Sequence, residues 1–174
     1  MENSTRAAGP GSYSRITPFN GNWILLEPSS DTIYTLMPDC SLRPFIARTP
    51  PIHTMDPEVF LIPRLISNRY YFMEGIKNVY DFRKEEGFPK TYFVYDTQEK
   101  EFSRYIIYNG DYTSKNEFYM VMLTPINAQG ESWATLNAFD LCRDYQKGKL
   151  KGKLKEVAAT LEEDDNRVVM LVKS

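Results

Sequence analysis

The sequence of 174 residues is poor in the side chains that most often bind metals or act as nucleophiles. It contains one histidine, His53, and two cysteines, Cys40 and Cys142, about a hundred positions apart. Neither cysteine belongs to a CxxC pair or to a zinc-ligand spacing with histidine. The pattern therefore predicts no metal site and no cofactor, and it gives no indication of the redox compartment.

Catalytic motifs are lacking as well. No GxSxG, HExxH, P-loop, GxGxxG or calcium-loop pattern occurs in the chain. Any Ser/His/Asp or Cys/His system would have to use His53 as its base. His53 follows Thr49, Pro50, Pro51 and Ile52, so we expect it in a surface loop, which could also present it at the mouth of a site.

Long apolar runs and an excess of one charge are both missing. No stretch approaches the roughly 20 apolar residues of a membrane helix, and the first residues lack the apolar core of a secretory signal. The net charge is −2, which excludes a whole-protein basic footprint for nucleic acid. Five lysines between positions 147 and 155 form a local basic run that we interpret as a solvated face. The chain alone leaves its localisation unknown.

Aromatic residues are plentiful and indicate strands. The 12 Tyr, 10 Phe and 2 Trp make up 14% of the chain, and many stand in short runs bounded by turn residues. Runs at 23–27 and 32–37, and again at 92–95 and 102–108, each flank a polar turn, which predicts two hairpins of one pattern. Further strands are expected at 44–47, 59–66, 69–73 and 118–123, with Pro63 marking a bulge or an edge.

Two runs are apolar at every position, residues 118–123 and 168–172. Such strands need cover on both faces of their sheet. Because the first three-quarters of the chain has almost no helical periodicity, stacked antiparallel sheets explain them better than a parallel sheet wrapped by helices. The fold class is therefore mainly β, either a propeller or a multi-sheet sandwich.

Helical periodicity is confined to the C-terminal quarter. Ala138, Leu141, Cys142 and Tyr145 fall at i, i+3, i+4 and i+7, with Asn137 as a plausible N-cap. A second apolar stripe begins at Leu150 and ends at Leu161. We expect a short helical segment at about 137–163, inserted before the last strand.

With these features, the chain resembles the six-bladed β-propeller family of unknown function found in gut-bacterial lipoproteins. Residues 8–13 (AGPGSY) are similar to its Gly-Pro-Gly-x-Tyr loop, and residues 22–34 are similar to its blade hairpin. The tail from Tyr145 to Lys173 is similar to its C-terminal end. The resemblance implies a C-terminal half of the ring and an exported, lipid-anchored location.

Length sets this chain apart from a complete ring. Blades take about 40 to 50 residues each, so 174 residues minus the helical segment leave room for roughly three. We therefore expect a flexible segment at 1–13 and a single partial propeller at 14–174. An open arc leaves apolar blade faces uncovered at two ends. We expect these faces to bind a second copy of the chain or a missing N-terminal half, or else the helices to pack over one end. Carbohydrate and peptide are further candidate partners.

For function, the recognisable features belong to a scaffold, so the first hypothesis is a non-catalytic ligand- or protein-binding module at the bacterial cell envelope. Arg48 and Arg69, at predicted strand ends, and His53 are the candidate binding residues for a rim that could take an anionic ligand. Tyrosines such as Tyr92 and Tyr95 serve either as a sugar or peptide platform or as packing between sheets. The alternatives are a carbohydrate-active hydrolase or lactonase-type propeller enzyme, and a structural fragment inactive without its other half.

Overall fold

The chain folds into antiparallel sheets with two short helices, as seen in a computed structural model that describes residues 16–127 and 131–173. Three larger sheets follow one another along the chain, and a two-stranded hairpin projects from the second. The predicted mainly β, antiparallel class is therefore confirmed. The predicted flexible segment at 1–13, and the AGPGSY loop within it, lie outside the described residues.

The first sheet is a four-stranded meander. Its strands are β1 (Ile16–Phe19), β2 (Asn22–Leu25), β3 (Thr32–Leu36) and β4 (Leu42–Ala47), in that order across the sheet. The turn between β1 and β2 is tight, and both of its residues, Asn20 and Gly21, have positive φ. This is the backbone that two-residue hairpin turns require.

The second sheet is also a four-stranded meander, interrupted once. It contains β5 (Val59–Ile66), β6 (Tyr70–Lys77), β9 (Lys90–Asp96) and β10 (Glu101–Arg104), and the hairpin of β7 (Tyr80–Asp81) and β8 (Glu86–Gly87) projects between β6 and β9. Strand β5 lies at the edge of the sheet and its register shifts between Pro63 and Leu65. Both expectations for Pro63, a bulge and an edge, are confirmed.

The third sheet contains β11 (Thr124–Pro125), β12 (Ser132–Leu136) and β13 (Val168–Val172). The helices α1 (Ala138–Gln146) and α2 (Gly152–Ala158) connect β12 to β13, so both lie inside the predicted helical segment and before the last strand. The predicted N-cap is confirmed, because the Asn137 side chain accepts a hydrogen bond from the Phe139 N–H. Two short 3-10 turns, η1 (Ile52–Thr54) and η2 (Met120–Met122), complete the elements.

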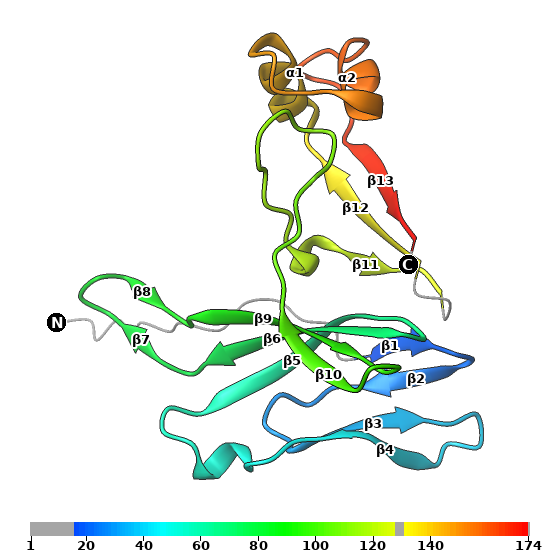
Figure 1. Ribbon diagram of the computed structural model, residues 1–174, viewed down its shortest axis with the longest axis vertical. Coiled ribbons are helices and arrows are strands. Elements are labelled where there is room, and N and C mark those ends of the chain that lie inside the picture. The colour runs from blue at the N-terminus through cyan, green and yellow to red at the C-terminus, as the bar shows by residue number, and fades with distance from the viewer. Residues whose placement is uncertain (1–15, 128–130, 174) are drawn as a thin grey trace, which may run out of the picture.

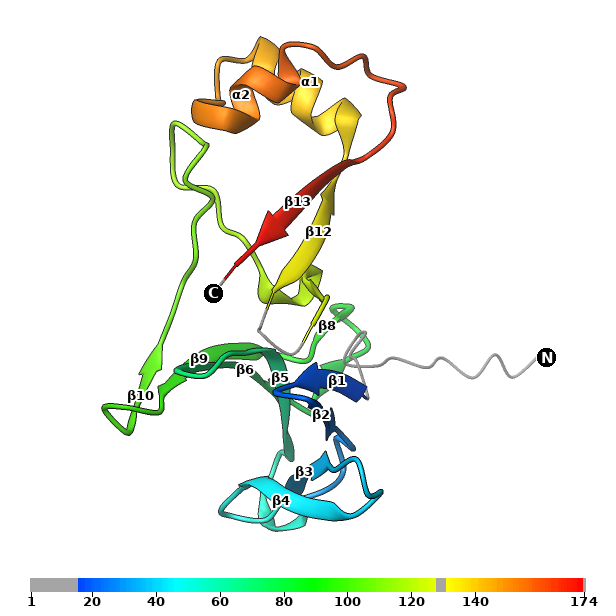
Figure 2. The same cartoon turned by 90° about the vertical axis from the view of Figure 1, so that its right-hand side faces the viewer.

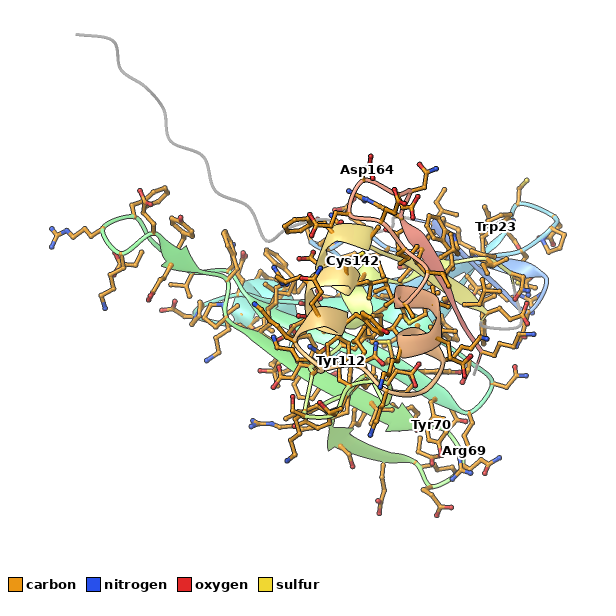
Figure 3. The ribbon with its side chains drawn as sticks, turned by 90° about the horizontal axis from the view of Figure 1, so that it is seen from above. Trp23, Arg69, Tyr70, Tyr112, Cys142 and Asp164 are labelled. Carbon is orange, nitrogen blue, oxygen red and sulfur yellow. The ribbon has the colours of Figure 1, made fainter. Side chains whose placement is uncertain are left out.

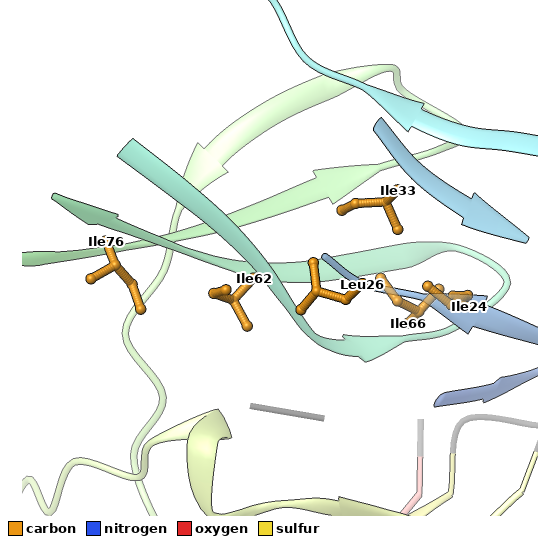
Figure 4. Packing of buried hydrophobic residues seen from close by; sticks show 6 residues of the cluster. All are labelled: Ile24, Leu26, Ile33, Ile62, Ile66 and Ile76. Carbon is orange, nitrogen blue, oxygen red and sulfur yellow. The ribbon is translucent and has the colours of Figure 1, made fainter. Parts of the chain in front are cut away.

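The sheets are arranged in chain order, with the second between the first and the third, and the helices at the far end of the third (Figures 1 and 2). The first two sheets share a core of aliphatic side chains (Figure 4). Its buried members are Ile24, Leu26, Ile33, Ile62, Ile66 and Ile76. Burying each such side chain contributes roughly 1.5 to 3 kcal/mol, so this contact fixes the two sheets together.

The helix pair is tied to the long connection that follows β10. Asp111 accepts a hydrogen bond from the Leu154 N–H in the first turn of α2, at 3.0 Å. The Tyr112 hydroxyl donates to the buried Asp144 of α1, also at 3.0 Å. Burial, with this hydrogen bond second, raises the pKa of Tyr112 to about 12. Both tethers position the connection before it reaches the third sheet.

Three strand expectations need correction. Residues 118–123 are not a strand but a bend around η2, with Met120 and Leu123 buried against β5 and β12. The strand predicted at 102–108 ends at Arg104. Strand β13 is covered on one face only, because Val169 and Leu171 are 59% and 64% exposed. A strand that is apolar at every position can therefore leave one of its faces exposed.

Candidate functional site

Arg48 lies just after β4 and is held within the fold. One nitrogen of its guanidinium donates to the carbonyl of Val59 and contacts Met55 Sδ at 3.6 Å. Desolvation lowers the pKa of Arg48, although the nearby Asp31 opposes this shift. A half-buried guanidinium that is already bound to backbone connects the first sheet to the second and is poorly placed to bind an anion.

His53 lies in η1 and is exposed, as a surface-loop residue should be. Among the described residues it has no hydrogen bond and no ion pair, so no carboxylate orients its imidazole. The geometry that a nucleophile system needs is therefore not assembled around it.

Arg69 lies in the turn between β5 and β6 and pairs with Asp96 at the end of β9. Its Nε and one terminal nitrogen contact Asp96 Oδ2 at 3.0 and 2.8 Å, and its guanidinium lies 4.9 Å from the centre of the Tyr70 ring. Arg69 and Tyr70 lie side by side, well apart from Trp23 (Figure 3). No hydrogen bond or ion pair joins Arg69 to Arg48 or to His53 in the described chain.

A cavity of about 160 Å³ lies between β9 and the segment that leads from β10 to η2. Its walls are mostly apolar, and three of them are tyrosines, Tyr92, Tyr105 and Tyr119. The Tyr92 ring lies 5.8 Å from that of Tyr105 and 5.9 Å from that of Tyr119, so the three form one continuous aromatic wall. Glu117 supplies a carboxylate, which accepts a hydrogen bond of 2.7 Å from the Tyr119 hydroxyl.

Behind this wall lies a charge cluster of Glu74, Arg64 and Lys90, in which Glu74 and Arg64 are buried and Lys90 is about one-third exposed. Glu74 on β6 is 0% exposed and accepts a hydrogen bond from Arg64 Nε at 2.6 Å, with a second contact to the same guanidinium. Lys90 Nζ lies 2.8 Å from Glu74 Oε1, without the alignment of a hydrogen bond. A buried charge must be paired, and Arg64 and Lys90 supply the positive charges for Glu74. The Glu74 carboxylate is therefore a structural group.

The Tyr105 hydroxyl is buried and has no hydrogen-bond partner in the described chain. Burial, with the charge of Glu74 second, raises the pKa of Tyr105. The folded state therefore keeps this phenol protonated at a pH where the unfolded chain loses its proton. Stability from this group is present below about pH 10, the pKa of an ordinary tyrosine, and declines as the pH rises above it.

We expect Tyr105→Phe to be neutral or stabilising by up to about 1 kcal/mol at pH 7, because it removes an unpaired buried hydroxyl. Between pH 10 and 11.5 the variant should also lose less stability than the wild type. Urea unfolding at pH 7, at pH 10 and at pH 11.5 measures both effects. Tyr108→Phe, at an exposed tyrosine, is the control, and equal alkaline losses in all three proteins would contradict the expectation.

The first sheet leaves one apolar face uncovered within the described chain, and we call this the β1–β4 outer face. Two rows of directly opposed residues form it: Ile16, Leu25, Tyr34 and Pro44, and Pro18, Trp23, Leu36 and Leu42. Ile16, Trp23 and Leu42 are each about half exposed. The opposite face holds the buried Ile24 and Ile33. The uncovered face of the sheet is therefore as apolar as the face that packs in the core.

The third sheet repeats this arrangement at the other end of the chain. Trp133, Val169 and Leu171 share one face, while Ala134 and Ser132 on the opposite face are buried. We call the exposed side the β12–β13 outer face. Uncovered apolar sheet faces at both ends of a stack are typical of interfaces with further protein.

Sequence patterns identified Tyr92 as a candidate but missed Tyr105, Glu117 and Tyr119. The sequence predicts strands at 102–108 and 118–123, and strand patterns alone do not indicate that Tyr105, Glu117 and Tyr119 meet. The irregular path of the chain between β10 and β11 brings them together. The aromatic density of this region was the available signal, but spacing could not show the bend.

Neither helix of the described chain is long and apolar enough to span a membrane. No family model matches the sequence, and no curated protein matches it. A solved structure does match: a "Putative exported protein" from Bacteroides fragilis, with a TM-score of 0.57 and 14% sequence identity. The match covers 92% of this chain and 49% of that one. The two proteins therefore share a fold, and this chain spans about half the length of its structural neighbour.

Proposed function

We propose that the chain is a non-catalytic binding module, built as roughly three blades of a propeller-like ring, that binds a further three-sheet unit. The observation that carries the proposal is the pair of apolar outer faces, one on each terminal sheet. Each face would bury its exposed residues against the next sheet of a closed ring, as the second sheet buries its two faces here.

The arrangement of the strands supports this interpretation. The first two sheets are four-stranded meanders stacked in chain order, which is the form of propeller blades. The third sheet has three strands, with the helix pair inserted before the last. Three such sheets correspond to about half the length of the neighbour's chain, which leaves room for three more.

The occupant that we propose for the open side is a second three-sheet unit of the same kind. When this chain is alone, a second copy supplies it, with the β1–β4 outer face of each copy against the β12–β13 outer face of the other. Two copies then form a closed arrangement with two equivalent interfaces. The structural neighbour's description as exported supports the further proposal that this module acts at the cell envelope.

Sedimentation velocity over about 1 to 100 μM tests the proposal. We expect a reversible dimer, and we expect Trp23→Ser combined with Leu171→Ser to weaken association by at least about tenfold, since interface aromatics carry much of the binding energy. Phe139→Ser on α1, an exposed apolar residue outside both faces, should leave association unchanged. A monomer at 100 μM that binds no apolar dye would overturn the proposal.

A further inference from the structure

We propose that the tyrosine cavity between β9 and η2 binds a small organic cation, an amine or a quaternary ammonium group. The proposal is independent of ring formation, because every residue that lines the cavity comes from one continuous region, residues 92–120. Four groups carry the argument, the phenol rings of Tyr92, Tyr105 and Tyr119 and the carboxylate of Glu117.

The size of the cavity restricts the ligand. About 160 Å³ is far more than the roughly 10 to 15 Å³ that one water needs. It is also smaller than the roughly 300 to 1,000 Å³ of pockets for drug-sized molecules. A head group of a few carbon atoms around one nitrogen is in the right range.

The charges that face the cavity favour a cation. The faces of three tyrosine rings carry negative electrostatic potential, and they attract an ammonium group within about 6 Å. Glu117 adds a full negative charge, and no lysine or arginine forms an ion pair with it in the described chain. The cations nearby, Arg64 and Lys90, pair with Glu74 and do not line the cavity.

The chain already holds cations in this way at two other places. The Arg69 guanidinium lies 4.9 Å from the centre of the Tyr70 ring, and Lys115 Nζ lies 5.5 Å from that of Tyr108. The second pair belongs to the same connection as Glu117. Two tyrosine faces of this chain, one of them in the same connection as Glu117, therefore already attract a positive charge.

A sugar fits the same wall less well. A pyranose presents a hydroxyl on nearly every carbon and needs several hydrogen-bonding side chains, whereas the cavity offers one carboxylate and the tyrosine hydroxyls. Of these hydroxyls, that of Tyr119 is already bound to Glu117. An alkylammonium ion needs only the aromatic faces and the carboxylate.

Calorimetric titration of the whole chain with choline and with its neutral isostere, 3,3-dimethylbutan-1-ol, tests the charge directly. We expect saturable choline binding that is at least tenfold tighter than binding of the alcohol. Because this comparison uses the wild-type protein, it does not depend on the folding of any variant. Equal binding of both compounds, or of neither, would overturn the proposal, as would saturation by methyl glucoside or methyl galactoside without choline.

Two variants locate the site. Glu117→Gln preserves the shape and an acceptor for Tyr119 but removes the charge, so choline affinity should fall at least fivefold with an unchanged thermal unfolding midpoint. Glu162→Gln, at an exposed acid far along the chain after α2, should bind choline as the wild type does. Unchanged affinity in Glu117→Gln, or equal losses in both variants, would show that the cation binds elsewhere.

Discussion

Glu74→Gln is expected to destabilise the chain by about 3 to 5 kcal/mol. Glu74 is fully buried, and it compensates the charges of Arg64, which is 7% exposed, and Lys90. The isosteric amide fills the same space but removes the negative charge that Arg64 and Lys90 share around the buried Glu74 side chain. Breaking a buried pair in this way costs several kcal/mol, a large part of the 5 to 15 kcal/mol that holds an ordinary domain folded.

Urea unfolding followed by far-UV circular dichroism and intrinsic fluorescence measures this loss. The matched control is Asp96→Asn, an equally conservative change in the more solvent-exposed pair of Asp96 with Arg69. It should move the urea midpoint far less, because solvent screens surface pairs. If Glu74→Gln and Asp96→Asn moved the midpoint equally, Glu74 would not be the structural anchor described here.

The second large effect concerns neighbouring residues on opposite faces of β2. Ile24→Ala should cost about 2 to 4 kcal/mol, because Ile24 is 2% exposed in the core between the first and second sheets. Trp23→Ala removes a larger side chain but one that is 49% exposed. At low protein concentration it should therefore cost less than Ile24→Ala.

Protein concentration separates the two variants further. If the β1–β4 outer face is an interface, the stability difference between the wild type and Trp23→Ala grows as concentration rises, because association adds to wild-type stability. Ile24→Ala loses stability within the folded unit itself, so this loss is already present at low protein concentration. Thermal unfolding at about 2 and 200 μM provides both measurements. A Trp23→Ala deficit that exceeds that of Ile24→Ala at 2 μM would contradict our assignment of the two faces.

Local patterns predicted most of the regular elements. Turn residues and aromatic runs located β2, β3, β5 and β9, while helical spacing with the Asn137 cap located α1. These signals succeed because they arise within a few residues of chain. Pro63 likewise indicated a bulge or an edge, since proline cannot donate to a neighbouring strand, and the structure shows both.

The candidate site was not predictable in the same way. Arg48 and Arg69 stand at strand ends as expected, but their partners, Val59 and Asp96, come from other strands. Residues 118–123 read as a strand because every side chain is apolar, yet η2 buries Met120 and Leu123 and leaves Val121 and Met122 exposed. These features depend on contacts between segments that are far apart in the sequence, and composition does not reveal such contacts.

The insertion of both helices between β12 and β13 has a consequence for the order of folding. Strand β12 ends at Leu136 and its partner β13 begins at Val168, so the ladder between them joins distant positions near the end of the chain. Such separations add little to the equilibrium cost of loop closure but delay the pairing. During synthesis, Ala134 and Leu65 emerge long before Met170 and Val172 can cover them. We expect the nascent chain to expose this cluster until β13 has left the ribosome.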